Sequence, residues 1–363
     1  MDKEYKYMVC TRCITYNHAP YIEDTLRGFA IQETTFPVVH CIIDDASTDG
    51  EQDVIRKYLK DNFERCSFSN EIIEETDSYC LIFMQHKNNK NCFLAVYLLK
   101  FNLFGKPEGK QIKEKYFARW TEQSKYVAMC EGDDYWIHPK KLQMQVDYLE
   151  SHDGYGMVYT PFRQYFQSTG TFQDVFTDED IKHDDNFKWD ILEQKVVVGT
   201  CTPLVVAKLL ECVKNIKDDY EGFLMGDTQK WFNLARLSKV GYIPEVMGVY
   251  RKHMGGATAT FDTSRRAKFI NACLDLHLHL AYKYGAPKRT VHVVKKLFGL
   301  QCFNLYFRTK DYEGAWKVND NYFYSNHFIG FIISAAQRLG IKNIHGLGTI
   351  LRMAVKCGII KLD

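Results

Sequence analysis

Apolar and polar residues alternate in blocks along the first 250 positions, and the blocks predict strands that alternate with helices. Tyr7–Thr15, Pro37–Ile43 and Tyr126–Cys130 are apolar runs of strand length. Between the first two runs, Ile22, Leu26 and Phe29 recur at the spacing of one helix face over Tyr21–Gln32. Strands separated by helices are typical of parallel sheets covered on both faces. The pattern therefore predicts an α/β fold with a mixed, mostly parallel sheet flanked by helices.

Later segments are assigned on the same grounds. A run rich in Leu, Tyr and Phe predicts a helix over Phe93–Phe104, and the basic, turn-rich stretch Gly105–Lys115 predicts a surface excursion. Met157–Thr160 predicts another strand, whereas residues 168–190 are acidic with little apolar patterning and predict a mobile excursion. Val196–Pro203 then returns to the fold.

Acidic clusters follow two of the predicted strands. Asp44–Gly50 comes after the second strand, and Glu131–Asp134 comes after the run Tyr126–Cys130. The carboxyl ends of parallel strands meet at one edge of a sheet, where open α/β folds bind ligands. Three carboxylates within Glu131–Asp134 repel one another unless a cation lies between them, and a divalent ion shared with substrate phosphates would supply it. The alternative is a solvated acidic turn that caps the following helix.

Five segments occur in an order and spacing that match a known family. They are Cys13–Ile22, Ile43–Gly50, Ala128–Trp136, Gly226–Asp227 and Tyr250–His253. With these motifs the chain resembles the family 2 glycosyltransferases of the GT-A fold, of the kind that builds bacterial surface polysaccharides. The resemblance covers roughly residues 5 to 255. It implies an inverting transfer of sugar from a nucleotide-diphosphate donor, with a UDP-sugar expected, to a hydroxyl of a glycan or lipid-linked oligosaccharide.

The resemblance also implies a metal site. Asp133 falls at the position of the DxD-type motif that directly binds Mn²⁺ or Mg²⁺, and His253 is a second metal ligand or a diphosphate contact. Glu131 replaces the leading Asp of the family and would reach the ribose or the hydration shell of the metal. Asp134 would support the site or cap the next helix, and Arg251 would clamp phosphate.

Nucleoside contacts follow from the same comparison. Asp44 lies where the family places a carboxylate that accepts the N3–H of uracil. Thr15, Tyr16 and Asn17 lie where the first strand meets the nucleoside. For Asp45, Ser47 and Asp49 we expect turn and cap chemistry before a helix.

Asp227 is the expected general base, because inverting members of the family carry theirs at this Gly-Asp or Glu-Asp step. It would take the proton from the acceptor hydroxyl. Its alternative role is to cap the helix that carries Trp231 and Leu234.

Charge divides the chain of 363 residues unevenly. Residues 1–250 hold 29 basic and 39 acidic residues, whereas residues 251–363 hold 18 and 6. We expect a catalytic domain over residues 1–258 and a helical extension over residues 259–363. The basic extension would contact an anionic membrane surface or a second subunit, and nucleic acid is not expected because no reader motif accompanies the charge.

The residues Met1–Lys6 are charged and do not resemble a signal peptide. We therefore expect a cytoplasmic protein, with attachment to the inner face of the membrane as the alternative. Twelve cysteines then predict reduced thiols. Cys10 and Cys13 have CxxC spacing but alternate faces of one strand, so no zinc site is expected.

Three other functions compete with glycosyl transfer. A sugar nucleotidyltransferase would open with a Gly-rich basic loop after the first strand, and Tyr16–Pro20 is not such a loop. A catalytically silent homologue would bind a nucleotide or sugar without turnover. A glycoside hydrolase would need two carboxylates that face each other across a sugar, which the sequence does not test.

Overall fold

The computed structural model describes residues 4–65, 73–216, 225–255, 262–323, 326–339 and 347–360. The chain divides into two compact units. Unit 1 comprises Met1–Asp185, Val197–Asn215 and Leu234–His253; unit 2 comprises Asn186–Val196, Ile216–Asn233 and Met254–Asp363. The longest segment of unit 2 begins at Met254, and two shorter segments join it.

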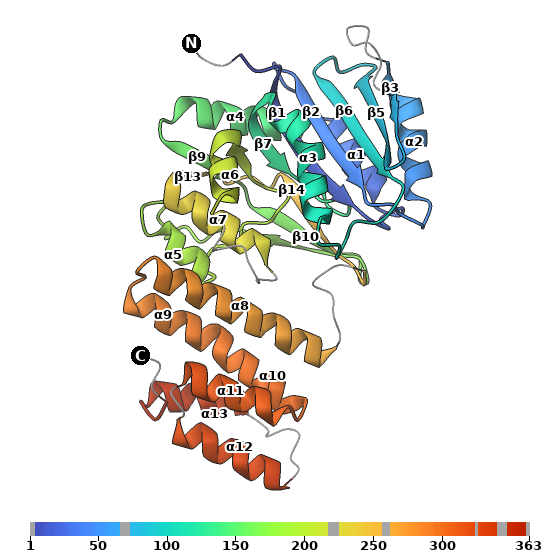
Figure 1. The fold of residues 1–363 in the computed structure, drawn as a ribbon. Helices are drawn as coiled ribbons and strands as arrows, with labels where there is room; N and C mark the ends of the chain where they lie inside the picture. The colour runs from blue at the N-terminus through green and yellow to red at the C-terminus, as the bar shows by residue number, and fades with distance from the viewer. Residues whose placement is uncertain are drawn as a thin grey trace. The chain divides into compact units, whose positions relative to one another are not determined.

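Unit 1 is built on a ten-stranded mixed sheet in the order β13-β9-β12-β7-β1-β2-β6-β5-β3, with β4 paired to β5 (Figure 1). The strands are β1 (Tyr7–Thr15), β2 (Val38–Asp44), β3 (Phe63–Glu64), β4 (Ile73–Glu75), β5 (Tyr79–His86), β6 (Cys92–Leu99), β7 (Ser124–Met129), β9 (Tyr155–Tyr159), β12 (Leu204–Val206) and β13 (Lys239–Tyr242). The central strands β7, β1, β2 and β6 are parallel, while β12 and β5 flank them antiparallel. The predicted mixed α/β sheet is confirmed.

Helices cover both faces of this sheet. Alternate residues of β1 fall in different cores: Val9 and Cys13 pack with α1 (Ile22–Ala30), α2 (Glu51–Asn62) and α4 (Lys141–Ser151). Cys10 packs with α3 (Gly109–Thr121) on the opposite face. The two CxxC sulfurs are therefore separated by the sheet, as the strand periodicity predicted. Helix α6 (Ala207–Lys214) lies against β7.

A second sheet of four strands completes unit 1. Its order is β11 (Thr171–Val175), β10 (Phe162–Phe166), β14 (Gly248–Lys252) and β8 (Tyr135–Trp136). Strand β8 directly follows the acidic motif after β7, and β14 directly precedes His253. Pairing of Val249 with Tyr135 therefore brings two distant parts of the sequence together.

Unit 2 is helical in the part of it that the structure describes. It contains α5 (Phe187–Leu192), the first residues of α7 (Gly226–Leu237), α8 (Thr263–Lys283), α9 (Lys288–Val294), a π-helical turn η2 (Lys295–Gly299), α10 (Leu300–Arg308), α11 (Tyr312–Tyr322), α12 (His327–Leu339) and α13 (Leu347–Lys356). One core joins α5, α8 and α9, and another joins α10 to α13. The expected helical extension is present. Of the helices in the described ranges, none combines the length and apolar character that crossing a bilayer requires.

Three local predictions were wrong. The segment predicted as a helix over Phe93–Phe104 forms strand β6, which pairs with β2 and β5 and is buried on both faces. Such a strand shows no polar alternation, so its sequence resembles that of a buried helix. Within residues 168–190, Thr171–Val175 is strand β11. Helix α3 begins at Gly109, inside the expected excursion Gly105–Lys115.

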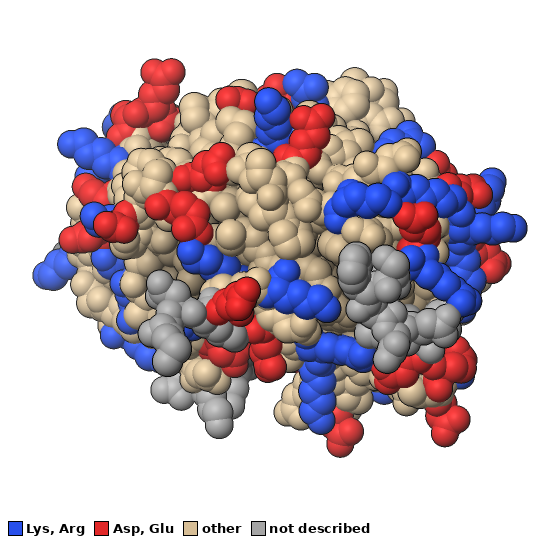
Figure 2. Space-filling model, turned by 90° about the horizontal axis from the view of Figure 1, so that it is seen from above, with Lys and Arg blue, Asp and Glu red and all other residues tan. Residues whose placement is uncertain are grey.

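Surface charge is mixed where it can be seen. On the face shown in Figure 2, acidic and basic side chains are interspersed and do not form one extended patch of a single sign. The excess of basic residues in the sequence lies after residue 250.

Candidate active site

The site is built where three parallel strands end. Strand β1 lies between β2 and β7. Strand β2 follows it along the chain and pairs with one edge of β1, and the later strand β7 pairs with its other edge. Such a switch point is where open α/β sheets bind ligands. Backbone hydrogen bonds join the three ends: Asp45 N donates to Thr15 O at 2.9 Å, and Gly132 N donates to Ile14 O at 3.0 Å.

Gly132 allows the acidic loop to approach β1 this closely. A Cβ atom added at this position would lie 2.0 Å from Thr15 Oγ1 and 2.3 Å from Thr15 Cβ. Because real side chains do not pack at such distances, the glycine is required by the close backbone approach. It fixes the place of the residue that follows, Asp133.

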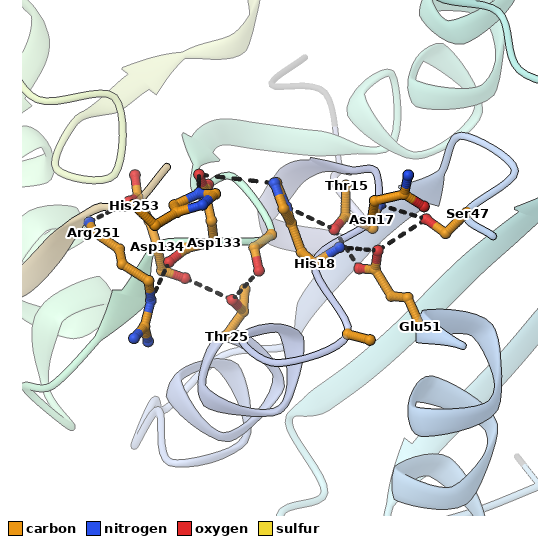
Figure 3. Close-up of polar contacts among 12 residues, drawn as sticks. Thr15, Asn17, His18, Thr25, Ser47, Glu51, Asp133, Asp134, Arg251 and His253 are labelled. Carbon is orange, nitrogen blue, oxygen red and sulfur yellow. Dashed lines mark hydrogen bonds and ion pairs between the residues drawn. The ribbon is translucent and has the colours of Figure 1, made fainter. Parts of the chain in front are cut away.

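Three side chains converge as a possible metal site (Figure 3). Asp133 Oδ2 lies 3.0 Å from His253 Nε2 and 3.9 Å from His18 Nε2. The three ligand atoms lie within 4.8 Å of one another, and all three residues are partly buried. With metal–ligand bonds of about 2.1 Å, two ligands of one ion lie at most about 4.2 Å apart, so both measured distances fit a shared cation.

The structure thus brings together Asp133 and His253, the two residues predicted as metal ligands, and adds His18. In the sequence, His18 stood out only as part of the segment Cys13–Ile22. A histidine in a loop after a strand gives no sign of which way it points, so only the fold identifies it.

A buried hydrogen-bond network lies behind His18. The Thr15 hydroxyl contacts His18 Nδ1 at 3.2 Å and donates to Glu51 Oε1. Glu51 Oε2 accepts from His18 N at 2.8 Å and from the Ser47 hydroxyl at 2.9 Å. Glu51 is fully buried at the start of α2; burial raises its pKa to about 7, against the effect of these hydrogen bonds. Sequence reasoning missed Glu51 because an acid at a helix start usually serves as a solvated cap.

Arg251 and Asp134 hold the acidic loop to strand β14. Arg251 N donates to Asp134 Oδ1 at 2.9 Å, and Arg251 Nε donates to Asp133 O at 2.9 Å. The guanidinium also donates to Asp24 at 2.7 Å and to Gln167 at 2.8 Å. Burial raises the pKa of Asp134 well above its ordinary value, and the charge of Asp133 adds to this effect. These contacts give Arg251 a role in holding the site; the phosphate clamp expected from sequence stays a prediction.

Asp44 ends β2 as a fully buried carboxylate with one satisfied oxygen. Its Oδ1 accepts from Ser47 N at 3.0 Å and from the Gln52 side chain. Within the described part of the chain, its Oδ2 is buried and has no hydrogen-bond partner. Burial raises the pKa of Asp44, whereas its hydrogen bonds lower it.

An open cleft of about 430 Å³ lies beside the ends of β2 and β6. It is lined by Ala46, Ser47, Thr48, Gln52, Arg56, Glu75, Cys80, Leu98, Leu99 and Lys100.

The loop after β1 carries the other predicted nucleoside contacts. Thr15 is buried, and Tyr16 is 43% exposed. Asn17 has a left-handed backbone with φ of 56°, a conformation that asparagine tolerates better than most residues. Its side-chain oxygen accepts from Thr48 N at 2.8 Å, and its own N–H donates to Ser47 Oγ at 2.9 Å. Asn17 therefore ties this loop to the loop after β2.

Asp45 and Asp49 have structural contacts. Asp45 accepts from Leu103 N at 2.8 Å and from Lys113 Nζ at 3.0 Å, which anchors the segment after β6. Asp49 Oδ1 accepts from Glu51 N at 3.1 Å, the turn chemistry expected before α2.

The remaining predicted residues lie in different places. Glu131 is half-buried in the acidic loop of unit 1. Asp227 belongs to unit 2, in the first turn of α7, where it is 51% exposed and pairs with Lys230 at 3.1 Å. Unit 1 therefore holds every predicted nucleotide and metal residue, and unit 2 holds the predicted base.

Comparison with known proteins gives remote relatives. No protein-family model matches the chain. It is 27% identical over 259 residues to the uncharacterized protein Rv1520 of Mycobacterium tuberculosis and to the uncharacterized protein Mb1547 of Mycobacterium bovis. Each alignment covers 70% of this chain and 61% of the relative. The chain thus spans about three fifths of the length of these curated relatives.

Solved structures with some similarity include S. aureus TarS 1-349, with a TM-score of 0.48 and 15% identity over 86% of this chain and 90% of that one. Another is the mannosyltransferase PcManGT from Pyrobaculum calidifontis in complex with GDP-Man and Mn²⁺, with a TM-score of 0.47 and 15% identity over 98% and 82%. At these scores the likeness is remote and assigns no activity to this chain.

Proposed function

We propose that this protein is a metal-dependent, inverting glycosyltransferase. It would transfer sugar from a nucleotide-diphosphate donor, with UDP expected, to a hydroxyl of a glycan or lipid-linked oligosaccharide in surface polysaccharide synthesis. The observation that carries the proposal is that two groups lie at one switch point of the sheet. One is the buried carboxylate of Asp44, and the other is the cation cluster of His18, Asp133 and His253. Thr15 joins them, because it is the register partner of Asp44 and contacts His18 of the cation cluster.

Asp44 is suited to receive the base of the donor. A buried acceptor without a donor costs roughly 1–3 kcal/mol, and an N–H from a nucleobase would remove this cost. The exposed ring of Tyr16 would stack on the base, and Asn17 would keep the loop in place. Uracil has the required ring N–H beside carbonyl groups, which supports UDP as the donor nucleotide.

Asp133 and His253 are suited to hold a divalent ion, which when bound supplies positive charge to the donor diphosphate. Arg251 and Asp134 would keep Asp133 in position through the bonds described above. Glu131, half-buried in the same loop, would contact the ribose. A cation bound at Asp133 would offset the repulsion between the carboxylates of the acidic loop.

Asp227 is proposed as the general base. It would take the proton of the acceptor hydroxyl while that oxygen attacks the anomeric carbon and the bond from that carbon to the diphosphate breaks. A single in-line displacement inverts the anomeric configuration. The exposed carboxylate at the start of α7 is accessible to a large acceptor.

The test is calorimetric titration of UDP, GDP and dTDP into the protein, with and without Mn²⁺. We expect UDP binding that requires Mn²⁺ and that Asp133→Ala weakens. With a UDP-sugar and an acceptor, Asp227→Asn should retain donor binding and lose transfer. No nucleotide binding under any condition would refute the proposal, and binding without turnover in the wild type would favour a silent sugar- or nucleotide-binding homologue.

A further inference from the structure

The hydrogen-bond network behind His18 determines which ring nitrogen carries its proton. Glu51 receives three donors on two oxygens: the Thr15 hydroxyl, the Ser47 hydroxyl and the backbone N–H of His18. Ser47 Oγ in turn accepts from Asn17 N at 2.9 Å, so its own proton is directed to Glu51.

The Thr15 hydroxyl can give its single proton to only one acceptor. Because that proton goes to Glu51, the contact of 3.2 Å between Thr15 Oγ1 and His18 Nδ1 requires His18 to be the donor. His18 then carries its proton on Nδ1 and an unprotonated lone pair on Nε2. This is the arrangement found in metal-binding histidines, whose second nitrogen donates to an oxygen of the protein.

The Nε2 lone pair of His18 faces a carboxylate. Nε2 lies 3.9 Å from Asp133 Oδ2, and His253 Nε2 lies 3.0 Å from the same oxygen. The rings of His18 and His253 stand nearly perpendicular, at 88°, with centroids 5.6 Å apart. Two acceptors at this distance repel each other, and a cation between them would convert the repulsion into two bonds.

We propose that His18 is a third metal ligand, oriented by Thr15 and Glu51, and that the site therefore selects Mn²⁺ or another first-row transition ion over Mg²⁺. Two imidazole nitrogens with one carboxylate suit such ions, whereas Mg²⁺ prefers an all-oxygen shell. The inference rests on the cation site of the proposed function, and it concerns neither the sugar nor the acceptor. Glu51 is a positioning residue, because it acts through Thr15 and His18.

The first experiment is pulsed electron paramagnetic resonance of Mn²⁺ bound to the full chain without nucleotide. Each coordinated imidazole contributes a nitrogen modulation, and uniform ¹⁵N labelling identifies it. We expect two histidine nitrogens in the wild type, one in His18→Ala and one in His253→Ala. His152→Ala, which changes an exposed histidine at the end of α4, is the matched control and should retain both.

A competition titration measures the selectivity. We expect Mn²⁺ to bind at least about tenfold more tightly than Mg²⁺ to the wild type, and His18→Ala to lose about 10–100-fold in Mn²⁺ affinity. A single nitrogen in the wild-type spectrum, or displacement of Mn²⁺ by an equal concentration of Mg²⁺, would overturn the inference.

The positioning role is tested separately. Thr15→Val removes the hydroxyl at nearly constant volume and should weaken Mn²⁺ binding, whereas Thr15→Ser restores the hydroxyl and should recover it. Glu51→Gln should weaken binding while both nitrogens still contribute to the spectrum of the bound fraction. Equal Mn²⁺ affinity in Thr15→Val and the wild type would refute the positioning role, and thermal unfolding checks that each variant is folded.

These outcomes separate the two proposals. Two nitrogens without any nucleotide binding would leave the metal inference standing and refute the proposed function. One histidine nitrogen in the spectrum together with Mn²⁺-dependent sugar transfer would refute the metal inference and support the proposed function.

Discussion

At the scale of single residues, one added methyl group at Gly132 should strongly weaken the binding of Mn²⁺ and UDP. In Gly132→Ala the new methyl group would meet Thr15 Oγ1 at 2.0 Å, so the acidic loop must move away from β1. We expect the affinities for Mn²⁺ and UDP to fall at least about tenfold, and the free energy of unfolding to fall by about 1–3 kcal/mol, as overpacking usually costs. Calorimetry and denaturant unfolding measure the two effects.

Gly248→Ala is the matched control for this prediction. A Cβ atom at Gly248 would have its nearest contacts at 3.5 Å, an ordinary van der Waals distance. Its metal and nucleotide affinities should stay within about twofold of the wild type. A Gly132→Ala protein that binds both ligands normally would show that the loop can hold Asp133 from a different backbone position.

The same residues show what the sequence could reveal about the site. Asp44, Asp133 and His253 were predicted because each stands in a motif with a recognisable spacing. His18 and Glu51 were missed because their roles depend on hydrogen bonds across three loops. Neither residue type nor spacing specifies which side chain will form a hydrogen bond with a buried hydroxyl in the folded protein.

At the scale of elements, an ion-pair network links β1, α3 and α6. Glu114 on α3 pairs with Arg12 of β1 and with Lys214 of α6, the latter at 2.7 Å. Burial opposes ionisation of Glu114, but the two cations prevail and hold its pKa down to about 2, below the ordinary 4.5. A depressed carboxyl pKa stabilises the fold above the ordinary value, and this stabilisation is lost as the pH falls from 4.5 towards 2.

The variant Glu114→Gln should therefore show a weaker pH dependence of unfolding in that window. Because the carboxylate is partly exposed and screened by solvent, we expect a difference of about 1 kcal/mol between the ends of the window. Urea unfolding at a series of pH values measures it. Glu108→Gln, at an exposed position before α3, is the control and should follow the wild type. Parallel curves for wild type and Glu114→Gln would contradict this account of the network.

Elements also mark the limit of what the hydrophobic pattern can predict. Strands β1, β2 and β7 and helix α1 were predicted near their observed positions. Strand β6 was predicted as a helix, since its pairing with β2 and β5 buries both faces and removes any alternation. Edge strand β11 was missed, since its exposed residues carry no apolar pattern and only the pairing with β10 defines it.

At the scale of the whole molecule, the charge imbalance favours an anionic surface as partner of the helical unit. Residues 251–363 carry 18 basic and 6 acidic residues, and α12 and α13 expose Phe331 (72%) and Met353 (62%). Cations near an anionic membrane contribute about 1 kcal/mol each, and apolar side chains add to binding. We expect the full chain to sediment with phosphatidylglycerol vesicles. Salt at about 0.5 M should release it, because salt screens the attraction between its cations and the anionic lipid.

Arg338→Glu with Lys356→Glu, on exposed positions of the same two helices, should weaken this binding at least about tenfold. Lys57→Glu with Lys90→Glu, at exposed positions of unit 1, serves as the charge-matched control. Equal binding to neutral phosphatidylcholine vesicles would rule out charge as the cause. Concentration-dependent self-association without vesicle binding would indicate instead that the unit contacts a second copy of the chain.

Under the proposed function, the unsatisfied oxygen of Asp44 has a consequence for which activated sugars could serve as donors. A carboxylate oxygen accepts hydrogen bonds and donates none, and the unprotonated ring nitrogen N3 of a cytosine placed against it would also be only an acceptor. Sugars activated as CMP derivatives would therefore be turned away whatever their shape. One atom at the end of a strand would thus restrict the available building blocks to sugars activated on nucleotides whose base has a ring N–H, before any contact with the sugar itself is made.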